Sequence, residues 1–133
     1  MERYSVVCVA GSFLGTLGGE PFRFPHRWTE HGVELAGSFT GAHLLHASVA
    51  ACVLNDLYRE AAALGVELAG VRVEASGGFD DDWTSKGVDY LVQLDSPADA
   101  ATLQRLLQRV DEVAEVPRAL RAGAKVGRVG LPD

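Results

Sequence analysis

The chain has 133 residues, of which 47% are hydrophobic, and a formal net charge of −6 with only 12 Lys and Arg residues. This length and apolar content fit one globular domain over residues 1–133, with a buried core. The few scattered cations argue against a nucleic-acid partner. No apolar run reaches the length of a membrane span, and Met1-Glu2-Arg3-Tyr4 lacks the form of a secretion signal, so we expect a cytoplasmic protein with no membrane partner.

The first third of the chain predicts short strands. Tyr4 to Val9 is rich in β-branched residues and predicts a strand, with Cys8 as a small core residue. After a glycine-rich turn, Phe22-Arg23-Phe24 predicts a second strand that Pro25 ends, and we expect these two strands to form a hairpin. Val33-Glu34-Leu35 is a candidate third strand in the less regular stretch 26–41.

A single long helix is predicted over residues 40–65. Ser38 or Thr40 can cap its start, and Gly65 supplies a left-handed end. Between Leu44 and Leu57 apolar and small residues reach every face, whereas a surface helix keeps a broad polar side. We therefore expect this helix to be buried on most sides, with Cys52 near its middle.

The second half predicts a hairpin, a helix and a last strand. Residues 70–76 and 88–94 alternate apolar and polar side chains, and the polar break between them begins at Gly77. Ser96-Pro97-Ala98-Asp99 predicts a helix start with Ser96 as its cap. A turn from Pro117 to Leu120 and a strand over residues 125–129 follow. Strands, long helix, strands, helix and strand make the predicted class α+β.

The segment Leu44 to Cys52, continuing through Asp56 to the strand Val71-Arg72-Val73-Glu74, resembles the cysteine-bearing helix of the OsmC/Ohr family. These are the osmotically inducible protein C and organic hydroperoxide resistance proteins. Val116-Pro117 resembles that family's second-cysteine turn, and the resemblance covers nearly the whole chain. It implies antiparallel sheets wrapped around long central helices in an intertwined homodimer.

The resemblance also implies a chemistry, the reduction of organic hydroperoxides. In the family a thiolate attacks the O–O bond and becomes a sulfenic acid, a second Cys condenses with it, and an external dithiol restores both thiols. An Arg favours the thiolate and a Glu holds that Arg. Cys52 stands at the attacking position, whereas Ala42 replaces the Glu, Val116 replaces the second Cys, and Phe13 falls about where the Arg is expected. Three of the four positions thus depart from the pattern.

The lost cation has a large effect on the thiol. At its ordinary pKa about 3% of a free thiol is ionised at neutral pH, and a neighbouring cation that lowers the pKa to ~6 would raise this to roughly 90%. Asp56 lies one helical turn beyond Cys52, where a carboxylate opposes ionisation. Without a thiol at Val116, a sulfenic acid would depend on an external thiol.

A polar row crosses the apolar helix at spacings of three and four, and it has two interpretations. Its members are Ser48, Cys52, Asn55, Asp56 and Arg59. In one interpretation they form a hydrogen-bond ladder, with Asp56 against Arg59 at a dimer seam and Cys52 as a small buried hydrophobe. In the other they line a pocket in which Arg59 replaces the missing cation.

Two functions follow from these alternatives. The first is a thiol protein that reduces hydroperoxides through Cys52 with an outside reductant. The second is a non-catalytic dimer that binds a small hydrophobic ligand in an apolar interface pocket near Phe13, Trp28 and Phe39.

No metal site or cofactor is expected. His43 and His46 are three residues apart on a helix, but no third ligand stands at motif spacing. Asp80-Asp81-Asp82 lacks the spacing and glycine of a calcium loop and predicts a solvated turn. Cys8 and Cys52 have no CxxC spacing, so a structural disulfide is not expected.

Overall fold

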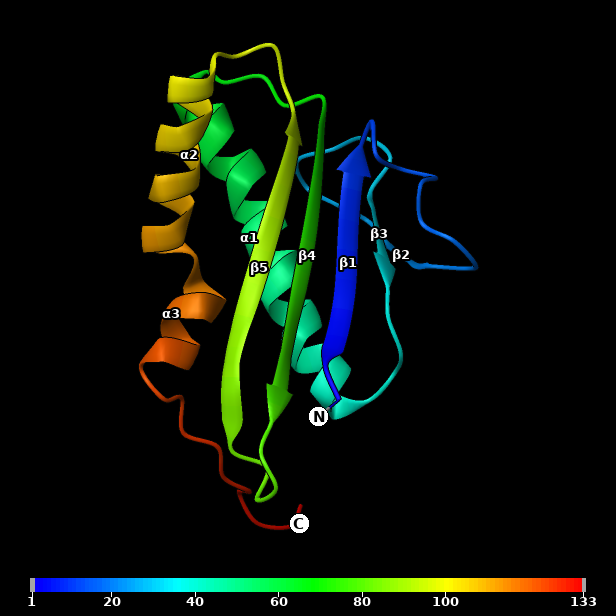
Figure 1. Cartoon of the computed structure of the whole chain (residues 1–133), viewed down its shortest axis with the longest axis vertical. Helices are drawn as coiled ribbons and strands as arrows, with labels where there is room; N and C mark the ends of the chain where they lie inside the picture. The colour runs from blue at the N-terminus through cyan, green and yellow to red at the C-terminus, as the bar shows by residue number, and fades with distance from the viewer. Residues whose placement is uncertain (1, 133) are drawn as a thin grey trace.

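The computed structural model describes residues 2–132. Five antiparallel strands form one sheet in the order β2-β3-β1-β4-β5, and the long helix α1 crosses one face of it (Figure 1). Helices α2 and α3 lie beside α1 on the β5 side. The elements are β1 (Tyr4–Gly11), β2 (Phe22–Phe24), β3 (Val33–Ala36), α1 (Gly41–Leu64), β4 (Gly70–Phe79), β5 (Ser85–Asp95), α2 (Ala100–Val113) and α3 (Glu115–Arg121). The predicted α+β class is confirmed.

Helix α1 has the predicted bounds and the predicted caps. The Thr40 side chain accepts a hydrogen bond from the His43 amide at 3.1 Å, so Thr40 and not Ser38 is the N-cap. Gly65 ends the helix in the left-handed region, with φ of 70°. Within residues 2–132 no helix is both long and apolar enough to span a lipid bilayer.

The core lies between α1 and the sheet. Alternate small apolar side chains of strands β1 and β4 point toward α1, and they pack against a row of buried side chains on the helix. Its most buried members include Val6, Cys8, Val53, Leu54, Leu57, Val71 and Val73. This packing fixes the middle of α1, and therefore Cys52, relative to the sheet.

The predicted hairpin of the first two strands is wrong. Strand β1 pairs with β3, with Cys8 opposite Leu35, and β2 pairs only with the outer side of β3. The central places of the sheet go to β1 and β4, whose residues are largely buried, whereas β2 has three exposed residues between Pro21 and Pro25. A strand flanked by prolines suits an edge, because proline cannot donate to a ladder. The candidate strand at Val33-Glu34-Leu35 is confirmed.

The second predicted hairpin is confirmed and is longer than expected. Strands β4 and β5 pair from Gly70–Asp95 to Phe79–Ser85, with an irregularity between Gly77 and Phe79. The strand thus continues through Gly77, where a break was predicted. The glycine does not mark a break there, because the packed neighbours of this strand position leave no room for a side chain. Residues 80–84 form the turn, in which the Asp80 carboxylate accepts hydrogen bonds from backbone amides.

The start of α2 lies later than predicted. Asp99, and not Ser96, is the N-cap, and its carboxylate accepts from the Thr102 amide at 2.7 Å. Ser96 instead donates to the Glu67 carbonyl, so its hydroxyl ties two loops together. The predicted turn at Pro117 is the short helix α3, which begins at Glu115.

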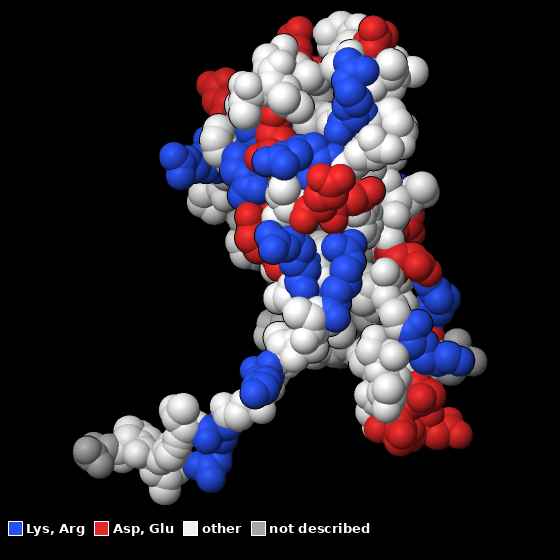
Figure 2. Space-filling view, turned by 90° about the vertical axis from the view of Figure 1, so that its left-hand side faces the viewer, with Lys and Arg blue, Asp and Glu red and all other residues white. Residues whose placement is uncertain are grey.

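The predicted strand over residues 125–129 is absent from the structure. This stretch has no regular secondary structure and pairs with no described strand, and Val126 is 97% exposed. It projects away from the body of the molecule (Figure 2). The sequence pattern that predicted a strand is a local property, whereas a strand also needs a partner strand to pair with.

Candidate functional site

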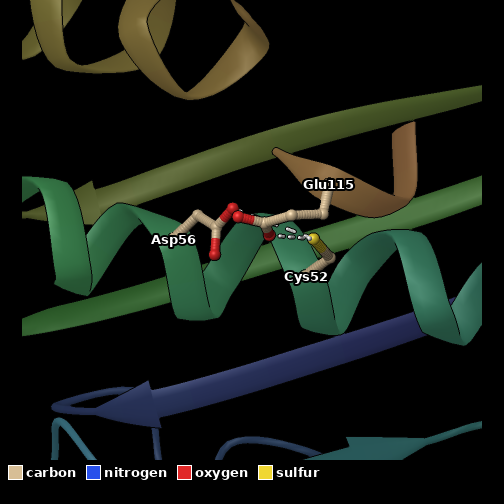
Figure 3. A group of neighbouring side chains, drawn as sticks. All are labelled: Cys52, Asp56 and Glu115. Atoms are coloured by element: carbon tan, nitrogen blue, oxygen red, sulfur yellow. Dashed lines mark hydrogen bonds between the residues drawn. The ribbon is translucent and has the colours of Figure 1, made fainter. Parts of the chain in front are cut away.

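Cys52 lies on the side of α1 that faces the start of α3 (Figure 3). The spacing of Cys52, Asp56 and Arg59 on α1 places all three on one helical face, as predicted. Helix α3 brings Glu115 and Val116, which lie 63 and 64 residues beyond Cys52 in the chain, to the same place. Cys52 is half-buried, and its sulfur lies between the two helices.

The polar contacts of the sulfur come from both helices. The Glu115 Oε2 atom lies 3.5 Å from Cys52 Sγ, and the Asp56 Oδ2 atom lies 3.9 Å from it. The backbone N–H of Val116 donates to the sulfur at 3.4 Å. Val116 therefore does contact Cys52, at the position where the family resemblance places the second cysteine.

One guanidinium holds the two carboxylates. Arg59 donates to Glu115 Oε1 at 2.8 Å and lies 3.2 Å from Asp56 Oδ2. It also pairs with Glu60 at 3.1 Å, and Glu60 accepts from Arg109 of α2 at 3.0 Å. This network ties α1 to both smaller helices. The predicted contact between Asp56 and Arg59 is confirmed.

These surroundings disfavour the thiolate. Burial raises the pKa of the Cys52 thiol, the Val116 N–H bond opposes that rise, and the charges of Asp56 and Glu115 add to it. Arg59 is the main cause that lowers the pKa of Glu115 to about 2. Burial and the neighbouring Glu115 raise the pKa of the fully buried Asp56 carboxyl.

Cys52, Asp56 and Glu115 also have the atom types of a metal site. One donor atom from each lies within 4.8 Å of the others. A cation already stands at these carboxylates, however, because Arg59 binds both of them. A metal ion would have to displace that guanidinium, so the geometry fits an ion-pair network better than a metal centre.

The other predicted site residues lie around this cluster or away from it. Asn55 donates to Asp56 at 3.2 Å and lies 3.3 Å from His26, whereas the Ser48 hydroxyl donates to the Leu45 carbonyl in its own helix. Phe13 lies over Gly70 at the start of β4, where a Cβ on that glycine would come within 2.9 Å of its ring. The structure thus brings neither Ser48 nor Phe13 into the polar contacts of Cys52.

A shallow apolar groove of about 410 Å³ runs along a neighbouring face of α1. One wall is a helical stripe of Leu44, Ser48, Ala51 and Asn55, and strands β2 and β3 supply much of the other. Its lining also includes Cys8, Phe24, His26, Val33 and Leu35. The pocket predicted near Phe13, Trp28 and Phe39 is not this groove, because none of those three residues lines it.

Sequence reasoning missed Glu115, although it makes the shortest side-chain contact of the Cys52 sulfur. Glu115 is 63 residues from Cys52, so no helical spacing connects them. The available signal was the neighbouring residue Val116. Because Val116 aligns with the family's second cysteine, which bonds to the reactive thiol, the side chain of the preceding residue, Glu115, is also expected near Cys52.

The comparisons with known proteins agree with one another. Residues 34–127, more than half of the chain, match a family model described as OsmC-like protein. The fold is similar to an OsmC-like protein from Mycoplasma pneumoniae, with a TM-score of 0.60, 16% identity and 67% of each chain covered. It is similar to an OsmC-like hydroperoxide resistance protein from Jannaschia sp. CCS1, with a TM-score of 0.60, 14% identity, and 98% of this chain and 95% of that one covered. No curated protein matches the chain.

Proposed function

Because the chain belongs to the OsmC-like family, we propose that Cys52 reduces organic hydroperoxides, slowly and from a protonated resting thiol. The observation that carries the proposal is the place of the sulfur, half-buried on α1 and bonded to the Val116 amide at 3.4 Å. One structurally similar protein is named a hydroperoxide resistance protein, which supports the substrate class.

The proposed step needs one thiol only. The thiol loses its proton, the sulfur attacks the terminal oxygen of the hydroperoxide, and the O–O bond breaks. The alkoxide takes up a proton, so the products are Cys52 sulfenic acid and an alcohol. Since valine stands at position 116, an external dithiol must reduce the sulfenic acid, forming water and its own disulfide.

Turnover is expected to rise with pH. The reacting species is the thiolate, and burial together with Asp56 and Glu115 holds the pKa of Cys52 above its ordinary value. The active fraction at neutral pH is therefore smaller than that of a free thiol, and it increases through the alkaline range. A thiol with a lowered pKa would already be mostly ionised at neutral pH, and its turnover rate would not rise further in the alkaline range.

The test is consumption of cumene hydroperoxide with dithiothreitol as reductant. Wild type and Cys52→Ser are compared across the alkaline range, and Cys8→Ala is the matched control. Cys8 is a poor nucleophile because burial raises its pKa to about 12. We expect loss of activity in Cys52→Ser alone. Equal, slow consumption by wild type and Cys52→Ser would refute the enzymatic function.

We also propose that the protein is a homodimer in which a second copy covers the stripe of Leu44, Ser48, Ala51 and Asn55. Within the stripe Leu44 and Ala51 are exposed, Leu44 by 38%, and Ser48 and Asn55 are half-buried. Its small residues allow a second helix to approach closely, and β2 adds the half-exposed Phe22 and Phe24 beside it. The network around Arg59 lies next to this surface.

A second candidate function is the non-catalytic binding of a small hydrophobic ligand. The observation that favours it is the apolar lining of the groove along α1. It would be tested by titrating a fluorescent apolar probe into wild type and Leu44→Asp. Probe binding that survives Cys52→Ser and is lost in Leu44→Asp would support the groove, whereas equal binding to all three proteins would exclude it.

A further inference from the structure

We propose that Glu115, held by Arg59, suppresses the reactivity of Cys52 by keeping a negative charge beside the sulfur. The inference rests on the proposed function, in which Cys52 is the reacting group. It assigns to Glu115 an effect opposite to that of an activating residue, and removing the charge should therefore make the thiol faster.

The geometry leaves the carboxylate little freedom to turn away. Its Oε1 atom is bound to Arg59 at 2.8 Å, and this bond directs Oε2 to within 3.5 Å of Cys52 Sγ. Arg59 is itself fixed by Asp56 and Glu60 on its own helix. The ion pair thus holds the first turn of α3 against the sulfur and keeps the charge in place.

The charged groups near the sulfur differ in how far they are buried, and this decides which of them can be changed without disturbing the packing. Asp56 and Arg59 come from α1, and Glu115 comes from α3. Asp56 is 1% exposed and bonded to Asn55 and Arg59, so changing it would disturb the core. The Glu115 side chain is 61% exposed, which makes its charge the one that can be removed with least effect on packing.

The opposite hypothesis is that Glu115 accepts the thiol proton and speeds the reaction. A carboxylate whose pKa is about 2 is a weak base, because Arg59 stabilises its ionised form. Proton transfer from the thiol to this group is therefore strongly unfavourable. The two hypotheses predict changes of opposite sign for the same substitution.

The first measurement is the rate of Cys52 alkylation by iodoacetamide as a function of pH, in the full chain. Glu115→Gln keeps the size of the side chain and removes its charge. A unit charge about 4 Å away changes an ionisation equilibrium about fivefold even at the dielectric constant of water. We expect Glu115→Gln to react about fivefold faster at neutral pH and low salt, with the whole profile moved to lower pH.

The matched control is Glu112→Gln, which makes the same change in net charge on the exposed surface of α2. It should react at the wild-type rate. Cys52→Ser, in each background, identifies any label on Cys8.

Salt supplies a readout that a merely structural role would not give. Iodoacetamide is uncharged, so salt affects the rate through the thiol and its neighbours. At about 1 M NaCl the screening length is roughly 3 Å, so the exposed charge of Glu115 is screened. Wild type should react faster at high salt, and Glu115→Gln should change less.

A rate for Glu115→Gln at or below that of wild type and Glu112→Gln, with native circular dichroism, would overturn this inference. The result is independent of peroxidase activity. If alkylation changes as expected but no variant consumes cumene hydroperoxide, then the proposed function fails and the role of Glu115 stands.

Discussion

Gly77 shows how closely single residues constrain this fold. It lies in β4 between β1 and β5, paired with Tyr4 on one side and Val88 on the other. A Cβ at this position would collide with the Gly87 carbonyl oxygen and would come within 2.6 Å of His46 Nε2. His46 is fully buried and its other ring nitrogen is bonded to the Ala42 carbonyl, so the ring cannot move aside easily.

Replacing Gly77 should therefore destabilise the protein. We expect Gly77→Ala to lower the free energy of unfolding by about 2 kcal/mol, the usual cost of an overpacked buried position. Gly18→Ala is the matched control, since nothing lies within 4 Å of its added Cβ, and it should change stability by less than about 0.5 kcal/mol. Urea unfolding at one protein concentration measures both, and equal stability of the two variants would contradict the prediction.

The site residues differ in how far the sequence could predict them. Cys52, Asp56 and Arg59 belong to one helix, so their spacing alone predicted a shared face. Glu115 reaches the sulfur only because α3 packs on α1, and that contact depends on the path of 50 intervening residues through β4, β5 and α2. Tertiary packing, and not local pattern, decides such a neighbour.

At the scale of elements, local signals predicted the long helix well. Thr40 caps the start of α1 and Gly65 caps its end. Both caps contact residues fewer than five positions away, so a sequence pattern can encode them. Strand pairing is not local. Nothing in Tyr4 to Val9 indicates that β3 and not β2 will be its neighbour, and nothing in residues 125–129 indicates that this stretch pairs with no described strand. The errors therefore fall on strand partners and not on the main helix.

The cap of α1 gives a test at this scale. We expect Thr40→Ala to lower the free energy of unfolding by about 1 kcal/mol, because the His43 amide loses its side-chain acceptor. Ser38→Ala is the matched control, since the Ser38 hydroxyl does not serve as the cap. Thermal and urea unfolding should show a loss in Thr40→Ala only. A larger loss in Ser38→Ala would mean that the helix starts earlier than the structure shows.

At the scale of the whole molecule, the single chain covers one face of its central helix only in part. The sheet covers α1 on one side, and α2 and α3 cover a second side through residues such as Leu106 and Val110 (Figure 1). The stripe of Leu44, Ser48, Ala51 and Asn55 has only the shallow groove beside it. A helix with apolar residues on every face gains most from burial of its last open side.

Ala51→Arg tests whether a second copy supplies that cover. Ala51 is exposed in the middle of the stripe, and a long charged side chain there would separate two closely packed helices. We expect wild type to be a dimer and Ala51→Arg to be mainly monomeric in sedimentation velocity over a dilution series. Ala101→Arg, on the exposed surface of α2, makes the same substitution away from the stripe and should remain dimeric. A wild-type protein that stays a folded monomer at every concentration would refute the proposed assembly, because α1 would then be stable with its open side in water.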